Sequence, residues 1–399
     1  METVPAQEIA VRLDLFQQSL KENGLDGALI LHNVGIYYFS GTIQTSFLFI
    51  PAQGESLLLV VKSWDRAKRE SPLKRIQHIQ GRRELPGALT KAGYSHKGRM
   101  GLELDVLPSA FFLWLRKTFP SCEWKDISRL IRTQRMIKSE YEVAQIRRAL
   151  EIEHIAFTDL RRFIREGMTE LEVDGRLAMV ARKNGHQGIV RMRAWNQEMT
   201  YAHVLSGPNG DAASYLNSAH GGVGTCPCMP QGAGHKTIRR NEPIEVDLGL
   251  GVNGYVGDQS RTYVIGELPE SLQEAHDCSR RIHDRFAETA RPGVRCHEMY
   301  GMAAAEAEKA GLAGVFMGHG RDQVRFVGHG IGLEVDELPI LAPGFDIPLE
   351  AGMVLALEPK FVLPQEGVVG LEDDYLVTEK GVERLTLTEQ EVLRVIEAA

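Results

Sequence analysis

The chain has 399 residues, of which 43% are hydrophobic and 25% charged, a composition typical of folded proteins and a length that favours two domains over one core. The net charge of −7 provides no basic excess to neutralise phosphates, which argues against a nucleic-acid partner. Apolar runs such as Leu57 to Val61 are too short to span a bilayer. Because the first twenty residues lack an apolar signal segment, and five cysteines fit a reducing compartment, we expect a cytoplasmic protein without a membrane partner.

The first part of the chain alternates between helix-like and strand-like patterns. Residues 8–23 have the spacing of an amphipathic helix that ends at Gly24. The runs that follow predict an α/β domain with a mixed sheet over residues 1–134. The predicted strands are 27–31, 45–50, 56–61 and 100–103, and the predicted helices are 64–70 and 107–117.

A helix start marks the boundary of the second domain, which we place at residues 135–399. Ser139 and Glu142 have the Ser-x-x-Glu spacing of a capping box, and the apolar stripe of a long helix follows them.

This second domain contains an internal repeat. Residues 165–185 align without gaps with residues 291–311, at a constant offset of 126 residues. Each copy has the pattern of a helix start, an apolar stripe and a glycine stop. The repeat is either a structural duplication or a chance likeness of two amphipathic helices. The glycines that coincide at the ends are Gly167 with Gly293 and Gly185 with Gly311.

From residue 244 onward the pattern becomes that of strands. Gly249, Gly251 and Gly254 match the Gly-x-Gly-x-x-Gly fingerprint of dinucleotide-binding proteins. That motif requires a helix after the glycines, whereas residues 255–265 alternate as a strand does. The glycines are therefore interpreted as a connection between two strands. The predicted strands of this part are 244–248, 263–265, 354–357 and 375–378.

Two aspartates flank the glycine-rich connection. Asp247 ends one predicted strand, and Asp258 begins the next strand eleven residues later. A hairpin would place the two carboxylates side by side. Because neighbouring buried carboxylates repel one another and are costly to desolvate, a positive group should lie between them. The candidates are Arg261, in a structural salt bridge, and metal ions.

Three more candidate ligands lie downstream. His329 stands between two glycines, and Glu358 and Glu372 each adjoin an apolar strand, where a solvated surface acid would be unusual. With the two aspartates they supply a charge of about −4, which two divalent ions would neutralise. A set of carboxylate oxygens and one imidazole nitrogen is compatible with Mn, Co, Zn or Fe.

These segments, residues 246–266, 328–339, 355–359 and 370–380, resemble the metal motifs of the pita-bread family in order and spacing. That family includes methionine aminopeptidase, Xaa-Pro aminopeptidase, prolidase and creatinase. Residues 132–150 resemble the linker into its catalytic domain. The preceding domain resembles the creatinase-type N-terminal domain, so the likeness covers nearly the whole chain.

The resemblance implies an α/β creatinase-like N-terminal domain and an α+β pita-bread catalytic domain with an internal pseudo-twofold repeat. It implies a homodimer that hydrolyses its substrate with a water shared by two metal ions. By the same resemblance Glu358 also helps to activate that water. The implied ligands are Asp247 (bidentate), Asp258 and Glu372 (bridging), His329 and Glu358.

The sequence departs from the family's peptidases where many of them have histidines that handle the substrate. Pro230 stands 17 residues before Asp247, Arg325 stands four residues before His329, and Asp336 follows in the same motif. Asp336 cannot donate a hydrogen bond unless it is protonated. Arg325 is either a surface residue or a group that binds a substrate carboxylate. Possible replacements for the missing histidines, or plain loop residues, are Tyr215, His220 and His235.

Three functions are compatible with these observations. The first is an Xaa-Pro dipeptidase or aminopeptidase that cleaves a short peptide, with Glu358, Asp336 and Arg325 as candidate catalytic residues. The second is an enzyme that cleaves a non-peptide C–N bond, as creatinase and ectoine hydrolase do, and the missing histidines favour such a change of substrate. The third is a binding module without catalysis, against which the retained ligands argue.

Overall fold

The computed structural model describes residues 2–95 and 97–396. The chain forms two compact units, Met1–Arg135 and Met136–Ala399. Among the described residues, no helix has the length and apolar character that crossing a membrane requires.

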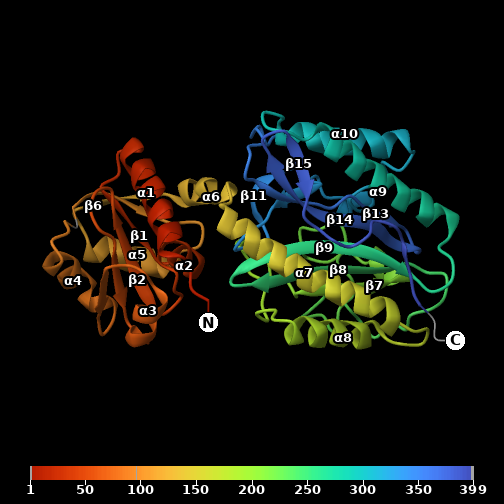
Figure 1. Cartoon of the computed structure of the whole chain (residues 1–399), viewed down its shortest axis with the longest axis horizontal. Coiled ribbons are helices and arrows are strands. Elements are labelled where there is room, and N and C mark those ends of the chain that lie inside the picture. Colours follow the sequence, from red (N-terminus) through yellow and green to blue (C-terminus); the bar gives the residue numbers. More distant parts are fainter. Residues whose placement is uncertain (1, 96, 397–399) are drawn as a thin grey trace. The chain divides into compact units, whose positions relative to one another are not determined.

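The first unit is built on a six-stranded sheet with the order β4-β3-β2-β1-β5-β6 (Figure 1). Strand β1 pairs antiparallel with β2 and parallel with β5, so the predicted mixed sheet is confirmed. The strands β4 and β6 at its edges were not predicted, because their side chains are only partly buried and carry little apolar pattern. The strands are β1 (Gly27–Ile30), β2 (Ser46–Pro51), β3 (Leu57–Val60), β4 (Arg75–His78), β5 (Gly98–Leu102) and β6 (Cys122–Asp126).

Helices lie between the strands of this sheet in the sequence. The first predicted helix is confirmed as α1, which ends one residue before Asn23 and is followed by Gly24 with a φ of +63°. Glycine adopts this left-handed conformation without steric cost, which explains the stop. The helices are α1 (Ala6–Glu22), α2 (Asn33–Ser40), α3 (Trp64–Glu70), α4 (Leu85–Lys91), α5 (Ser109–Thr118) and α6 (Ser128–Met136), with a 3₁₀ turn η1 (Arg82–Glu84).

The second unit is built on a ten-stranded sheet with the main order β11-β10-β12-β14-β9-β8-β7. Strands β13 and β15 pair with β14, and β16 pairs with β9. The glycine-rich connection joins β8 to β9 as an antiparallel hairpin, as predicted. The strands are β7 (Ala202–Ser206), β8 (Ile244–Val252), β9 (Tyr255–Val264), β10 (Gly328–Gly330), β11 (Glu337–Ile340), β12 (Val354–Leu357), β13 (Lys360–Leu363), β14 (Gly367–Thr378), β15 (Gly381–Arg384) and β16 (Leu393–Arg394).

Two helix pairs pack on this sheet, one for each copy of the repeat. Helices α7 and α8 contact β7–β9, whereas α9 contacts β13–β15 and α10 packs on α9 (Figure 1). The predicted capping box of Ser139 and Glu142 begins α7. The helices are α7 (Glu140–Phe163), α8 (Glu170–Lys183), α9 (Glu270–Thr289) and α10 (Cys296–Lys309), with 3₁₀ turns η2 (Gly207–Asp211) and η3 (Gly320–Asp322).

The offset of 126 residues holds in the structure as well. Helices α8 and α10 both have 14 residues, and each follows a glycine with positive φ. In both copies the glutamate of the first turn, Glu172 or Glu298, accepts a hydrogen bond of 2.7 Å from the backbone N–H of the N-cap residue. The same capping interaction at the same offset supports the structural duplication over the chance likeness.

The alternation of side chains along the strands separates an apolar face from an acidic face. On β8, Val246 and Leu248 belong to the core under α7 and α8, so Asp247 points to the opposite face. On β14, Tyr375 and Val377 belong to the core under α9 and α10. Residues an odd number of positions away, such as Glu372, therefore point away from the helices. The helices cover one face of the sheet and the acids collect on the other.

Arg261 lies on the helix side of β9 and is fully buried. Its guanidinium donates a hydrogen bond of 2.6 Å to Asp373 Oδ1 and further hydrogen bonds to backbone carbonyls of β9, β14 and the C-terminal segment. It is thus not the positive group that separates Asp247 from Asp258. Arg261 instead holds together the two strands that carry acids on their other face.

We expect Arg261→Met to lower the free energy of unfolding of the second unit by about 3–5 kcal/mol, because Asp373 loses its buried ionic partner. Urea unfolding followed by circular dichroism would measure the loss. Arg147→Met is the control, because Arg147 pairs with Glu383 at the surface and such pairs contribute about 1 kcal/mol or less. Equal unfolding midpoints for the two variants would contradict the structural role of Arg261.

Candidate metal centre

The acidic face carries a row of polar side chains across three strands. Asp247 on β8 lies opposite Ser260 on β9, and Ser260 lies opposite Glu372 on β14. Asp258 precedes Ser260 by two residues and therefore points to the same face. All three acids are at least 90% buried. The pairing of β9 with β14 thus brings acids together that are far apart in the sequence.

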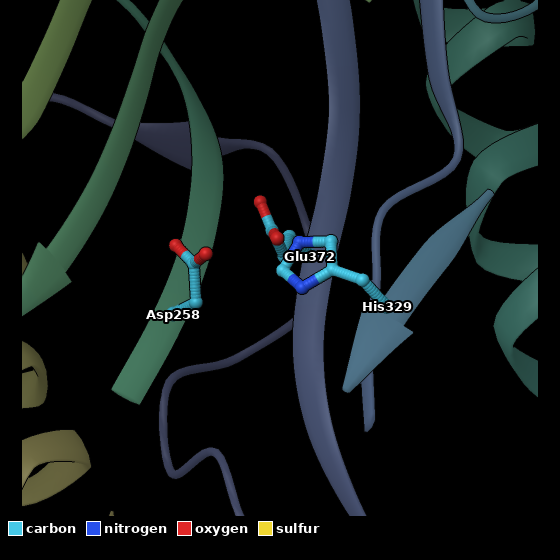
Figure 2. A group of neighbouring side chains, drawn as sticks. All are labelled: Asp258, His329 and Glu372. Carbon is cyan, nitrogen blue, oxygen red and sulfur yellow. The ribbon is translucent and has the colours of Figure 1, made fainter. Parts of the chain in front are cut away.

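The imidazole comes from the next pair of strands. His329 on β10 lies opposite Ala356 on β12, which in turn lies opposite Asp374 on β14. One ligand atom each of Asp258, His329 and Glu372 lies within 4.8 Å of the other two. Figure 2 shows their side chains pointing toward one another from three different strands. Among the described residues, only these three form such a group.

The other two predicted ligands adjoin this group. Glu358 follows β12, and its Oε1 lies 3.4 Å from Nε2 of His329. Asp247 contacts the group through a lysine: Lys360 Nζ lies 3.2 Å from Asp247 Oδ2 and 3.1 Å from Glu372 Oε2. The structure therefore gathers all five predicted residues in one cluster, but Asp247 lies outside the group that could share one ion.

Lys360 was not predicted from the sequence. It begins β13 between Pro359 and Phe361, and its side chain is fully buried. Phe361 belongs to the core under α9 and α10, so alternation directs Lys360 to the acidic face. A lysine at the start of an apolar strand is the one local signal that marks it.

The carboxylates of the cluster resist ionisation. Burial raises the pKa of Asp258 well above its usual range, and the negative charges of Glu372 and Asp247 raise it further. Burial also raises the pKa of Glu372, although Lys360 opposes this shift. Burial alone would lower the pKa of His329, but Glu358 and Glu372 raise it to about 9. The cluster therefore has a deficit of positive charge.

Lys360 and Asp247 are the exception, because each stabilises the charge of the other. Burial disfavours both charges. Even so, the neighbouring acids, Asp247 first, hold the pKa of Lys360 well above its usual value. Lys360 and then His220 hold the pKa of Asp247 well below its own.

The residues present fit a divalent cation. Oδ1 of Asp258 is buried and, among the described residues, has no hydrogen-bond partner, which is costly unless a cation or water satisfies it. Carboxylate oxygens with one imidazole nitrogen suit Mn, Fe, Co and Zn. Asp258, His329, Glu372 and Glu358 are the residues that could hold such an ion.

Two buried histidines flank the cluster on the β8 side. His203 on β7 lies opposite Asp247, and its ring nitrogen Nε2 lies 3.2 Å from Oε1 of Gln231. His220 comes from the segment after η2, and its Nε2 lies 3.3 Å from Asp247 Oδ2. Burial, aided by the neighbouring His220, lowers the pKa of His203 to about 4. His220 was one of the candidate replacements for the missing histidines, whereas His203 was overlooked despite its place on an apolar strand.

Asp336, Arg325 and His235 are the remaining candidates. Asp336 accepts hydrogen bonds of 2.8 and 2.9 Å from the backbone N–H groups of Arg193 and Ala194, an arrangement that anchors a loop. Arg325 and His235 are exposed. The structure thus gives Asp336 a structural task, while the predicted catalytic roles of Asp336 and Arg325 stay predictions.

Tyr215 and Pro230 complete the set of sequence candidates. Tyr215 is 43% exposed and accepts a hydrogen bond from Gln231, the residue that contacts His203. Pro230 is half-buried and precedes Gln231. Both therefore adjoin the histidine pair.

Comparisons with known proteins agree with the fold and the cluster. Residues 144–379 match the model of metallopeptidase family M24, and residues 12–137 match the creatinase/prolidase N-terminal domain. The Xaa-Pro dipeptidase of Pyrococcus horikoshii is 29% identical over 94% of this chain and 96% of its own length. The Xaa-Pro dipeptidase of Lactobacillus delbrueckii is 27% identical over 96% of this chain and 98% of its own length.

Solved structures give the same result. The prolidase from Pyrococcus horikoshii has a TM-score of 0.81 at 27% identity, and the X-Pro aminopeptidase from Thermotoga maritima has one of 0.80 at 25% identity. Each covers 96% of this chain and 99% of its own. The fold and the cluster therefore define a metal-dependent hydrolase with a creatinase-type N-terminal domain and a pita-bread domain, as predicted. The chain belongs to metallopeptidase family M24.

We expect Asp258→Asn to lower the affinity for Mn²⁺ by more than about 100-fold, since loss of even an outer hydrogen bond costs 10- to 100-fold. Metal analysis after equilibrium dialysis would measure the change. Asp159→Asn, which alters a partly exposed ion pair with Arg176, should leave the affinity unchanged. Equal metal content in both variants would remove Asp258 from the ligand set.

Proposed function

We propose that this chain is a dipeptidase that cleaves the bond before proline in Xaa-Pro dipeptides. The buried group of Asp258, His329 and Glu372 carries the proposal, because it lies on a fold shared over nearly its full length with proteins named Xaa-Pro dipeptidase or prolidase. The family is metal-dependent. A bound metal ion can polarise the carbonyl of a short peptide, which makes such a peptide a suitable substrate.

The residues of the cluster have two tasks in this proposal, metal binding and proton transfer. Asp258, His329 and Glu372 would hold the ion together with Glu358. A bound divalent ion lowers the pKa of water and polarises the scissile carbonyl. Glu358, 5% exposed and next to His329, accepts the proton that the attacking water loses.

His220 serves the other side of the reaction. It lies against Asp247, which fixes the orientation of its ring, and a donor at this position can stabilise the oxyanion or protonate the departing nitrogen. His203, whose ring centroid lies 5.7 Å from that of His220, supports it from β7. This pair takes the place of the histidines that are missing at Pro230 and Arg325.

Several finer predictions from the sequence belong to the proposal. The ion is Mn, Co, Zn or Fe, as the donor set allows. The predicted count of two ions requires Asp247 to be a metal ligand, and Asp247 also contacts Lys360. The chain is proposed to be a cytoplasmic homodimer, which light scattering coupled to size-exclusion chromatography would check. The substrate has a free carboxylate, for which the exposed Arg325 is the candidate partner.

A second candidate function has one observation in its favour. Asp336 stands where many peptidases of the family have a histidine, and its carboxylate is already engaged by two backbone N–H groups. A group so engaged cannot recognise a peptide carbonyl. A non-peptide C–N bond, of the kind that creatinase or ectoine hydrolase cleaves, does not present a peptide carbonyl.

We expect the chain, freed of metal by a chelator and reloaded with Mn²⁺ or Co²⁺, to release proline from a panel of Xaa-Pro dipeptides. Glu358→Gln should lower kcat by about 10²- to 10⁴-fold, the usual contribution of a general base. Colorimetric assay of free proline would measure both effects.

Asp159→Asn again serves as the control and should keep full activity. A metal-loaded chain that turns over no member of the panel would refute the dipeptidase. Cleavage of cyclic amides or guanidino acids by the same preparation would then support the second candidate.

A further inference from the structure

Lys360 places an ammonium group inside the acid cluster. Its Nζ contacts Asp247 Oδ2 at 3.2 Å and Glu372 Oε2 at 3.1 Å, and its side chain has no exposure to solvent. These two oxygens belong to two of the five residues for which the sequence predicted a role in holding two ions. A fixed cation therefore bridges two predicted ligands.

An ion bound to both of these oxygens would lie beside the ammonium or in its place. Metal–oxygen distances are about 2.0–2.2 Å, so such an ion would be at most about 5 Å from Nζ. Like charges at this separation in a buried site repel strongly, because little water screens them. The ammonium and a metal ion at this position therefore compete for the same two oxygens.

Asp247 has a second cationic or polar neighbour as well. Nε2 of His220 lies 3.3 Å from the same Oδ2 atom that Lys360 contacts. Two side-chain nitrogens therefore contact one oxygen of this carboxylate. In contrast, Oδ1 of Asp258 on β9 has no hydrogen-bond partner among the described residues.

A third buried acid, Glu245, interacts with the charge of Lys360. Glu245, two residues before Asp247 on β8, is fully buried and contributes to the raised pKa of Lys360. Its Oε2 accepts a hydrogen bond of 2.6 Å from Thr262. Movement of the ammonium out of the cluster would leave the carboxylate of Asp247 without its lysine partner, which is costly for a buried charge.

We propose that Lys360 substitutes for one of the two metal ions predicted from the sequence. The chain then binds one divalent ion, at Asp258, His329, Glu372 and Glu358, and Asp247 is the partner of the ammonium instead of a metal ligand. This inference builds on the metal site of the proposed function and concerns its ion count. It holds whichever C–N bond the enzyme cleaves.

The number of ions per chain tests the proposal. The full-length protein is freed of metal, titrated with Mn²⁺ by calorimetry and analysed by mass spectrometry of the metal content. We expect one ion per wild-type chain. Lys360→Gly removes the side chain and should raise the count to two, with Asp247 now available.

A buried lysine outside the cluster provides the matched control. Lys138 is also ion-paired and nearly unexposed, with its Nζ 3.2 Å from Glu337 Oε2. Lys138→Met should keep one ion per chain. Electron paramagnetic resonance gives an independent readout, because one Mn²⁺ ion gives the spectrum of an isolated centre and two nearby ions give a coupled one.

Two ions, or none, in the wild-type chain would overturn the proposal, even if Lys360→Gly failed to fold. A count of one in a folded Lys360→Gly would overturn it as well. Proline release is measured separately. A chain that binds one ion but cleaves no Xaa-Pro dipeptide refutes the dipeptidase and leaves this inference standing.

Discussion

Mutual repulsion among buried carboxylates is the constraint that shapes the second unit. Asp247, Asp258 and Glu372 lie in one region of a sheet face, nearly out of contact with water. Such charges are tolerated only when cations or hydrogen-bond donors lie among them. Lys360 and His220 serve Asp247, while Asp258 retains an unsatisfied oxygen. The difference between these two acids divides the cluster into a side that the chain itself neutralises and a side suited to a metal ion.

Buried acids are paired with different cations on the two faces of the sheet. On the helix side, Arg261 satisfies Asp373 with a rigid guanidinium that also binds four backbone carbonyls. On the acidic side, Lys360 supplies a compact charge at the end of a longer stem. The rigid cation fixes β9 against β14, and the strands so fixed determine where the acids of the other face can lie.

Local patterns in the sequence predicted most of the fold and the ligand set. The capping box at Ser139, the duplicated helices and the β8–β9 hairpin depend on residues close together in the chain. Family motifs then related Asp247 and Asp258 to the more distant ligands. Lys360 was not predicted, because its partner Asp247 is 113 residues away in the sequence. No local pattern says which strands become neighbours, and His203 was missed for the same reason, since only the pairing of β7 with β8 places it opposite Asp247.

The strand order has a consequence for folding during synthesis on the ribosome. Strand β14 lies between β9 and β12, although β9 ends at Val264 and β14 begins only at Gly367. The β8–β9 hairpin therefore emerges with its acids long before Lys360 and Glu372 have been synthesised. Until then the hairpin lacks Lys360, the ammonium that pairs with Asp247, so its acidic face stays hydrated. The centre can close only after β14 has been synthesised, which delays the burial of these charges until their partners exist.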